Sequence, residues 1–224
     1  MPMIDLHFPS TTKVGRPVPK SDFYKHLDVN ARIKQRFVDD VAGILWLYKL
    51  APSTLNVADG TQVHEIVLFL VTLKARDCPH DVFRFIDEQM PRHVLFILEH
   101  EGCCRLLLNY KEWKAGERAS FQIVKSFTTE WLPSGQLQLS LEGQSMDALY
   151  EALAGQVSGF GTHSAADTRR LIALQDELTR KQKLMEALQK RIRAEKQFAR
   201  QLEMNSEARA LKRDVARLKE ELNQ

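Results

Sequence analysis

Cysteine is scarce in this 224-residue chain, which contains Cys78, Cys103 and Cys104 and no C-x-x-C pair. An odd number of cysteines argues against a disulfide framework and indicates small buried side chains in a reducing cytosol. No apolar run approaches the roughly 20 residues that span a bilayer. The N-terminus lacks the basic stretch and apolar core of a secretory signal. These absences predict a cytoplasmic protein with no membrane segment.

The short motifs of several enzyme classes are also missing. The sequence contains no G-x-x-x-x-G-K-[S/T], no G-x-G-x-x-G and no G-x-S-x-G, which argues against nucleotide-hydrolysing enzymes and hydrolases of those classes. None of the seven histidines has another histidine at i, i+4 spacing or a cysteine at zinc-finger distance. We therefore predict no metal site and no cofactor.

Glycine and proline are absent from residues 164–224, although the whole chain contains 10 glycines and 8 prolines. Three glycines within residues 155–161 favour no regular element and predict a glycine-rich linker at 156–163. Ser164 and Asp167 then form a capping box at the start of a long helix. The chain thus divides into a globular domain at 1–155, the linker, and a helix at 164–224 of about 90 Å if it is continuous.

Residues 1–155 combine strand-like and helix-like patterns. Pro- and Gly-rich residues 8–20 predict an extended, irregular arm. Apolar periodicity predicts helices at 23–27, 30–41, 79–90 and 146–153. Strand patterns occur at 44–50, 63–73, 94–98, 105–110, 121–127 and 137–141, and the unbroken apolar run at 66–71 indicates a central strand buried on both faces. The fold class is α+β: a mixed sheet of about five strands with helical cover, followed by a long C-terminal coiled-coil helix.

Apolar residues in the C-terminal helix recur at coiled-coil spacing. So narrow a stripe cannot be buried by one helix, so we expect these residues to bind a second copy or a protein partner. Lys181, Glu195 and Ala199 occupy other core positions of the first frame, where charges fix register or partner choice. The first heptad frame holds Leu171, Leu174, Leu178, Met185, Leu188, Ile192 and Leu202, and the second holds Leu211, Val215, Leu218 and Leu222.

The two frames are out of register, and the break falls near residues 204–207. It indicates either a local change of supercoil in one long rod or a turn at which the second segment folds back on the first. The absence of glycine and proline favours the rod. A third interpretation is that the helix docks along its own domain.

The small positive charge of the chain is concentrated in this helix. Residues 1–163 contain 17 basic and 19 acidic residues, whereas residues 164–224 contain 15 basic and 10 acidic residues. Any exposed helix face needs charged residues, so the surplus points only weakly to nucleic acid. The candidates for phosphate contacts are Arg180, Lys181, Lys183, Lys190, Arg191, Arg193 and Lys196.

One short arrangement could carry chemistry. Glu112 and Lys114 are similar to the metal-binding E-x-K motif of restriction-type nucleases, in which acidic residues hold Mg²⁺ and the lysine supports an attacking water. Such a site needs a second carboxylate from a neighbouring strand, and Glu99 is the candidate. The alternative is a solvated strand end in a chain of which 27% is charged. We favour that alternative.

Several short segments taken together resemble a bacterial family catalogued as a domain of unknown function. Its members are encoded beside helicases and DNA methyltransferases in restriction or phage-defence clusters. The resemblance covers about residues 1–155 and implies defence against foreign DNA in a multi-subunit assembly, with no catalytic residues to transfer. It is carried by Val18-Pro19-Lys20, Phe23, Ile44, Trp46, Tyr48-Lys49-Leu50-Ala51-Pro52, Asn56-Val57, Val63-His64-Glu65-Ile66, Ile86-Asp87, Met90-Pro91, Leu95-Phe96 and Tyr110-Lys111.

These observations predict a non-catalytic accessory or adaptor subunit of a bacterial restriction-type or anti-phage DNA-processing complex. It would assemble through its coiled coil, with itself or with a helicase or methyltransferase subunit. The alternatives are a Mg²⁺-dependent nuclease that uses Glu99, Glu112 and Lys114, and a nucleic-acid-binding module that uses the basic helix. Salt dependence distinguishes the last alternative, because phosphate contacts release counterions and weaken as salt rises.

Overall fold

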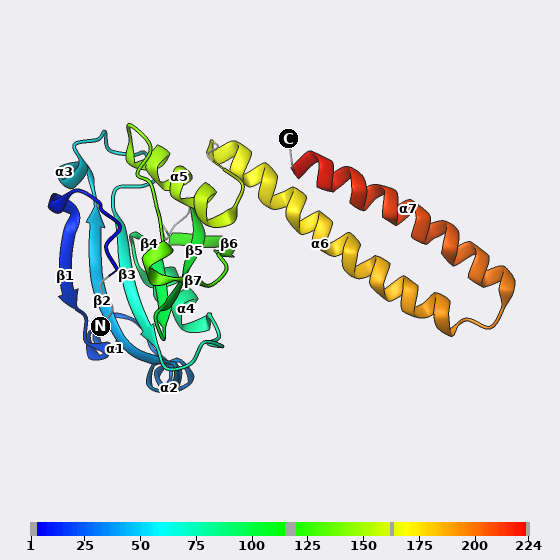
Figure 1. Ribbon diagram of the computed structural model, residues 1–224, viewed down its shortest axis with the longest axis horizontal. Helices are drawn as coiled ribbons and strands as arrows, with labels where there is room; N and C mark the ends of the chain where they lie inside the picture. The colour runs from blue at the N-terminus through cyan, green and yellow to red at the C-terminus, as the bar shows by residue number, and fades with distance from the viewer. Residues whose placement is uncertain (1–3, 115–119, 162–163, 223–224) are drawn as a thin grey trace. The chain divides into compact units, whose positions relative to one another are not determined.

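The computed structural model describes residues 4–114, 120–161 and 164–222. The chain divides into two compact units, residues 1–163 and residues 164–224. The first unit is a seven-stranded sheet with helices on it, and the second is a pair of long helices (Figure 1). Among the described helices, none has both the length and the apolar composition needed to cross a membrane.

The sheet is mixed, as the sequence predicts. Its main path runs in chain order from the first strand to the sixth, and the seventh pairs with the fifth. Among the described strands only the third and fourth are parallel to each other, and helix α4 (Asp81–Gln89) is the crossover between them. The strands are β1 (Lys13–Pro17), β2 (Val41–Leu50), β3 (Ile66–Leu73), β4 (His93–His100), β5 (Cys103–Lys114), β6 (Ser120–Thr128) and β7 (Leu132–Pro133).

Two strand predictions were wrong. The segment 8–20, which was expected to be irregular, contains β1. This strand pairs antiparallel with β2 at the edge of the sheet, where the missing amide hydrogen of Pro17 removes no hydrogen bond from the sheet. Residues 137–141 form no strand, although Leu137 and Leu139 are buried and their polar neighbours exposed. That segment follows a short 3-10 helix, Ser134–Gln136, and has the alternating burial of a strand without a pairing partner.

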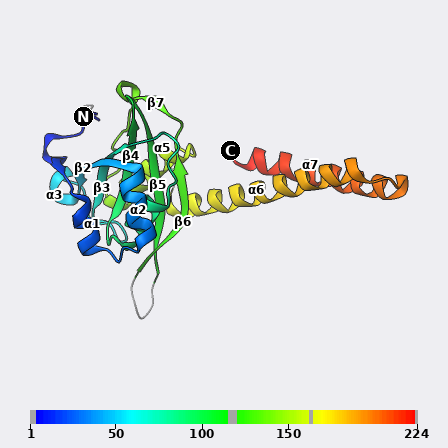
Figure 2. The same cartoon turned by 90° about the horizontal axis from the view of Figure 1, so that it is seen from below.

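One face of the sheet packs against α1 (Lys20–His26), α2 (Ala31–Asp40) and α4, and Figure 2 shows α1 and α2 in front of the strands. Val67, Phe69 and Val71 of β3 point into this core. Ile66 and Leu68, which alternate with them, are also fully buried, so they point to the other face. The expectation that β3 is buried on both faces is therefore confirmed.

The second face is covered by residues 4–8, by α5 (Met146–Ser158) and by the extended segment 137–141. Ile4, Leu6 and Phe8 are buried, and the Tyr48 hydroxyl of β2 accepts the Leu6 amide at 3.2 Å. Beyond the end of β2 lies a single-turn helix, α3 (Pro52–Leu55). Since α5 ends at Ser158, the expected linker at 156–163 begins inside a helix.

The start of α5 is tied to the loop before β3. The carboxylate of Asp147 accepts the amides of Thr61, Gln62 and Val63 at 2.7–3.1 Å. A Cβ at Gly60 would lie 2.4 Å from that carboxylate, so only glycine fits there.

The second unit is a helical hairpin, and the single rod favoured by the sequence is wrong. It consists of α6 (Ala165–Ala194) and α7 (Phe198–Leu222), which lie side by side (Figure 1). The turn lies at residues 195–197, upstream of the expected break. Glu195 leaves the helical conformation (φ −73°, ψ 129°), and its carboxylate accepts the Gln197 amide at 2.8 Å. The side chain of Glu195 thus accepts a hydrogen bond from a backbone amide of the turn, which contains neither glycine nor proline.

We expect Phe69→Ala to lower the free energy of unfolding by about 3–5 kcal/mol, because it removes a buried ring and leaves a cavity. Phe69 is 4% exposed and contacts the rings of Phe23 and Phe96 at centroid distances of 6.1 Å each. Urea denaturation measures the change, with exposed Val38→Ala as the control. An unchanged midpoint for Phe69→Ala would contradict this view of the core.

Candidate functional site

The residues of the proposed nuclease site do not converge. Glu99 on β4 pairs with Cys104 of β5, while Glu112 lies eight residues farther along β5. At the rise of an extended strand this separates the two carboxylates by roughly 26 Å, far beyond the reach of one metal ion. Glu99 is 3% exposed and accepts the Gly102 amide at 3.0 Å, which is the role of a turn residue. The side chain of Lys114 lies outside the described residues.

The polar cluster that the structure does assemble is centred on Lys111, which was not a candidate. The side chains of Lys111 and Asp87 are both fully buried, and Nζ lies 2.6 Å from Oδ1. The ammonium also donates to the carbonyls of Asp87 at 3.0 Å, Met90 at 3.2 Å and Arg92. Strand alternation could have identified Lys111 from the sequence. Leu107 lies on the face covered by α1, α2 and α4, and Lys111, four residues later on the same strand, points to the same face.

Neighbouring groups complete this cluster. Asn109 donates to Asp87 Oδ2 at 3.0 Å and accepts from Ser126 at 2.7 Å. The Tyr150 hydroxyl receives the Lys111 amide at 3.2 Å. Burial raises the pKa of the Asp87 carboxyl and lowers the pKa of the Lys111 ammonium. Because protein oxygens surround the ammonium, the cluster joins β5 to the end of α4.

Lys111→Met should lower the free energy of unfolding by about 3–5 kcal/mol, because it leaves the Asp87 carboxylate and three carbonyls without their buried cation. Asp87→Asn should also be costly. The double variant should lose less than the sum of the two single losses, since the charges interact directly. Urea denaturation of the four proteins measures this coupling, and strictly additive losses would contradict it.

His93 is a second buried ionisable group. It is 2% exposed and contacts the rings of Tyr150 and Phe121 at centroid distances of 4.3 and 5.1 Å. It lines a small cavity of about 200 Å³ with His64, Glu65 and others. Burial, together with the charge of Lys111, lowers the pKa of His93 from 6.5 to about 3. The imidazole is therefore neutral in the folded protein and cannot act as a general acid near pH 7.

This burial predicts acid sensitivity. Between pH 6.5 and pH 3 the unfolded chain binds a proton at His93 that the folded chain does not, so stability falls as the pH falls through this window. The full effect is on the order of 4–5 kcal/mol. We expect His93→Phe to lose less stability than the wild type between pH 7 and pH 4, measured by urea denaturation. Parallel pH profiles for the two proteins would refute the assignment.

The hairpin buries the predicted apolar stripe within itself. Leu188, Val215 and Leu218 are buried, and most other predicted positions are half-buried: Leu171, Leu174, Leu178, Met185, Ile192, Leu211 and Leu222. Lys181, predicted in this seam, lies 2.5 Å from Asp214 of α7 and fixes the register of the two helices. The hydrogen bond from Lys181, together with the charge of this lysine, lowers the pKa of Asp214. Much of the expected partner contact is thus made within one chain.

Three large apolar side chains remain outside the seam. Leu202 was assigned to the first heptad frame, but it is 63% exposed. The turn at 195–197 starts a new helix, in which the second frame begins earlier than expected and Met204 is half-buried in place of Leu202. Phe198 is 78% exposed and lies one helical turn before Leu202. Leu184 on α6 is 52% exposed. Phe198 and Leu202 therefore form an apolar patch on the outside of α7, which we call the tip patch.

The seven basic residues proposed to contact phosphate all belong to the hairpin, and all but Lys181 are exposed. Lys181 is committed to Asp214 and Glu177, so it is not available for phosphate. Arg180, Lys183 and Lys190 are exposed and lie along one face of α6 at helical spacing. The others, Arg191, Arg193 and Lys196, are exposed near the turn.

Comparison with known proteins identifies a family. A family model described as "Domain of unknown function (DUF4391)" matches residues 6–215, which cover most of both units. No curated protein and no solved structure matches the chain.

Proposed function

Because the chain belongs to the DUF4391 family, a domain of unknown function, we propose its role from its own surfaces. We propose that it is a non-catalytic accessory subunit of a cytoplasmic bacterial DNA-processing complex of the restriction or anti-phage type. The hairpin of α6 and α7 is its docking element, and the tip patch contacts the partner. A helicase or methyltransferase subunit is the kind of partner we expect.

The observation that carries this proposal is the exposure of Phe198 and Leu202. The hairpin closes its own seam, so these two side chains are not needed to hold α6 against α7. An exposed phenylalanine and leucine one turn apart form a contact that a protein partner can bury, with about 1.5–3 kcal/mol from each side chain. Arg193, Lys196 and Arg200 around the turn are exposed and supply a polar rim.

The separation of Glu99 from Glu112 supports the non-catalytic part of the proposal. A metal-dependent nuclease needs acidic groups that converge on the ion, whereas Glu99 on β4 lies opposite the start of β5 and Glu112 lies near its end. The basic face formed by Arg180, Lys183 and Lys190 supports a second candidate function, nucleic-acid binding by α6. The two functions differ in their dependence on salt.

The test is recovery of a partner from the native host with the tagged full chain. We expect mass spectrometry to identify a helicase or methyltransferase subunit in a stable complex with the wild type. The double variant Phe198→Ser/Leu202→Ser should reduce the recovered partner at least tenfold, because it removes the apolar contact. Ala199→Ser places the same side chain at an exposed neighbouring position and should leave recovery unchanged.

Equal recovery with the double variant, or recovery of no DNA-processing protein, would sink the proposal. Binding of a labelled duplex that weakens steeply between 50 and 200 mM salt, and that Lys183→Gln/Lys190→Gln abolishes, would favour the nucleic-acid function. Mg²⁺-dependent cleavage of plasmid DNA by the wild type, absent in Glu112→Gln, would refute the non-catalytic assignment.

A further inference from the structure

Two arginines of the first unit lie against one tryptophan ring. The guanidinium carbon of Arg76 lies 5.1 Å from the centroid of the Trp131 ring, and that of Arg105 lies 5.5 Å from it. These are the distances of cation–π contacts. Within the described part of the chain, neither guanidinium group forms an ion pair or donates a hydrogen bond. The ring thus gathers two like charges that no acidic side chain offsets.

The sheet fixes two of these three side chains. β5 and β7 pair antiparallel just beyond this point, and continuing their register places Arg105 opposite Trp131. Arg105 lies two residues before Leu107 on β5, so its side chain points to the face covered by α1, α2 and α4, and Trp131 packs against the same core. Arg76 comes from the loop between β3 and α4. Three segments far apart in sequence therefore build the cluster.

The charge of Arg105 is not neutralised by its surroundings. Arg105 is half-buried, and its Nε is buried without a hydrogen-bond partner among the described residues. Burial, together with the charge of Arg105, lowers the pKa of His80, the N-cap residue of α4. The N-terminus of a helix is itself partially positive. The carboxylate of Asp81, which opposes this potential, is shared by Arg32 and Arg36 at 3.8 and 3.9 Å. An anion would meet a net positive charge here.

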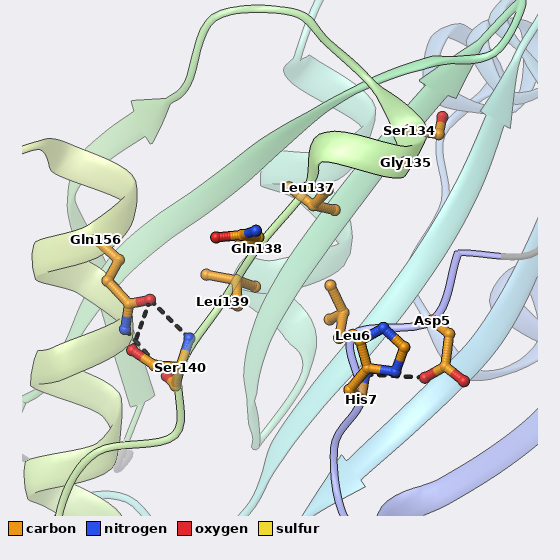
Figure 3. A pocket seen from close by; sticks show the side chains of 10 residues that line it. All are labelled: Asp5, Leu6, His7, Ser134, Gly135, Leu137, Gln138, Leu139, Ser140 and Gln156. Carbon is orange, nitrogen blue, oxygen red and sulfur yellow. Dashed lines mark hydrogen bonds between the residues drawn. The ribbon is translucent and has the colours of Figure 1, made fainter.

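The groove drawn in Figure 3 shows the opposite arrangement. It has a volume of about 660 Å³ and lies between residues 5–7 and residues 134–140. Its carboxylate, Asp5, already forms an ion pair with Lys13 at 2.9 Å. A charge that is paired within the chain contributes little to a ligand, whereas the two guanidinium groups on the tryptophan ring are available for one.

The chemistry of the cluster indicates phosphate. A guanidinium group presents a planar fork of N–H donors that matches two oxygens of a phosphate, and arginine stacked on an aromatic ring keeps this fork in place. A nucleic-acid strand carries phosphates at short, regular intervals, so neighbouring guanidinium groups can contact successive charges. A free phosphorylated molecule is normally bound in a concave pocket that buries most of it. Because Arg76 is exposed on a loop, the cluster is better suited to a polymer that runs over the surface.

We propose that Arg76 and Arg105, held together by Trp131, bind the phosphate backbone of a nucleic-acid strand. This site goes beyond the proposed docking by the hairpin and does not depend on it. It is also distinct from the basic face of α6, because its cations come from a loop and a strand of the first unit. In the accessory subunit, the cluster would hold the strand on which the partner acts while the hairpin binds the partner.

The test uses the full-length protein and a fluorescein-labelled DNA strand of about 20 nucleotides, free or annealed to its complement. Fluorescence anisotropy measures the affinity between 50 and 200 mM salt. Arg76→Gln/Arg105→Gln removes both guanidinium groups, and Arg76→Lys/Arg105→Lys keeps the charge without the planar fork. Arg16→Gln/Lys25→Gln is the matched control, since it removes two positive charges from exposed positions of the same unit. Urea denaturation verifies that each variant is folded.

We expect the wild type and the Arg16→Gln/Lys25→Gln control to bind DNA within about twofold of each other, and Arg76→Gln/Arg105→Gln to bind at least about tenfold more weakly at 50 mM salt. On the single strand, the slope of log affinity against log salt should become shallower by about 1.4, because each lost phosphate contact accounts for about 0.7. Arg76→Lys/Arg105→Lys should keep the slope and lose affinity, since the charge remains and the bidentate geometry does not.

Several outcomes would overturn the proposal. They are no binding of either form of DNA, an equal loss in the Arg16→Gln/Lys25→Gln control, and a loss in Lys183→Gln/Lys190→Gln but not in Arg76→Gln/Arg105→Gln, which would assign the strand to α6. A nucleoside triphosphate and a phosphoserine peptide serve as further probes. Arginine-dependent binding of either one as tight as that of the strand would assign the cluster to a free nucleotide or to a phosphoprotein instead. Phe198→Ser/Leu202→Ser should bind DNA as the wild type does, which separates this test from that of the hairpin.

Discussion

The buried ion pair of Lys111 and Asp87 is the constraint on which the arrangement of the first unit depends. Lys111 points from β5 into the otherwise apolar core, and its ammonium needs several acceptors to offset the loss of water. Those acceptors are available only if the end of α4 lies over β5, where the Asp87 carboxylate and three backbone carbonyls converge. Since α4 is the crossover between parallel β3 and β4, one lysine fixes the crossover against the sheet in one position.

The same device recurs on α2. Lys20 donates to the carbonyls of Phe37 at 2.7 Å and Val41 at 2.5 Å, and Lys74 donates to that of Val38 at 2.7 Å. A helix C-terminus carries unpaired carbonyls and a partial negative charge, which a lysine neutralises. Of the three helices on this face, α2 and α4 are thus anchored at their C-terminal ends by lysines from outside the helix.

Much of this fold was predictable, because the spacing of apolar residues along the sequence indicates which side chains are buried. The run from Ile66 to Val71 identified the central strand, and the hairpin of β4 and β5 followed from its turn. The same spacing does not show whether an extended segment forms hydrogen bonds with a neighbouring strand. Leu137 and Leu139 alternate as in a strand because the segment lies on the sheet, yet its edge is unpaired. The partners of Lys111 and Lys181 were also hidden, since Asp87 and Asp214 are far away in sequence and only the tertiary fold brings them close. Glu99 and Glu112 failed as a pair for a different reason, because the register of the β4–β5 hairpin places Cys104 opposite Glu99 and leaves Glu112 eight residues farther along β5.

The hairpin combines a closed seam with a basic exterior, and this combination bears on the choice of partner. The apolar stripe in the sequence leaves both a second copy and a different protein open as the partner. With the seam between α6 and α7 closed, the large apolar side chains that stay exposed among the described residues of this unit are the tip patch and Leu184. The unit contains five more basic than acidic residues. Two copies that met through this exterior would bring like charges together at an apolar contact, where lower dielectric strengthens their repulsion. A protein with an apolar pocket and an acidic rim would meet no such penalty, so under the proposed docking by the hairpin we expect a different protein rather than a second copy.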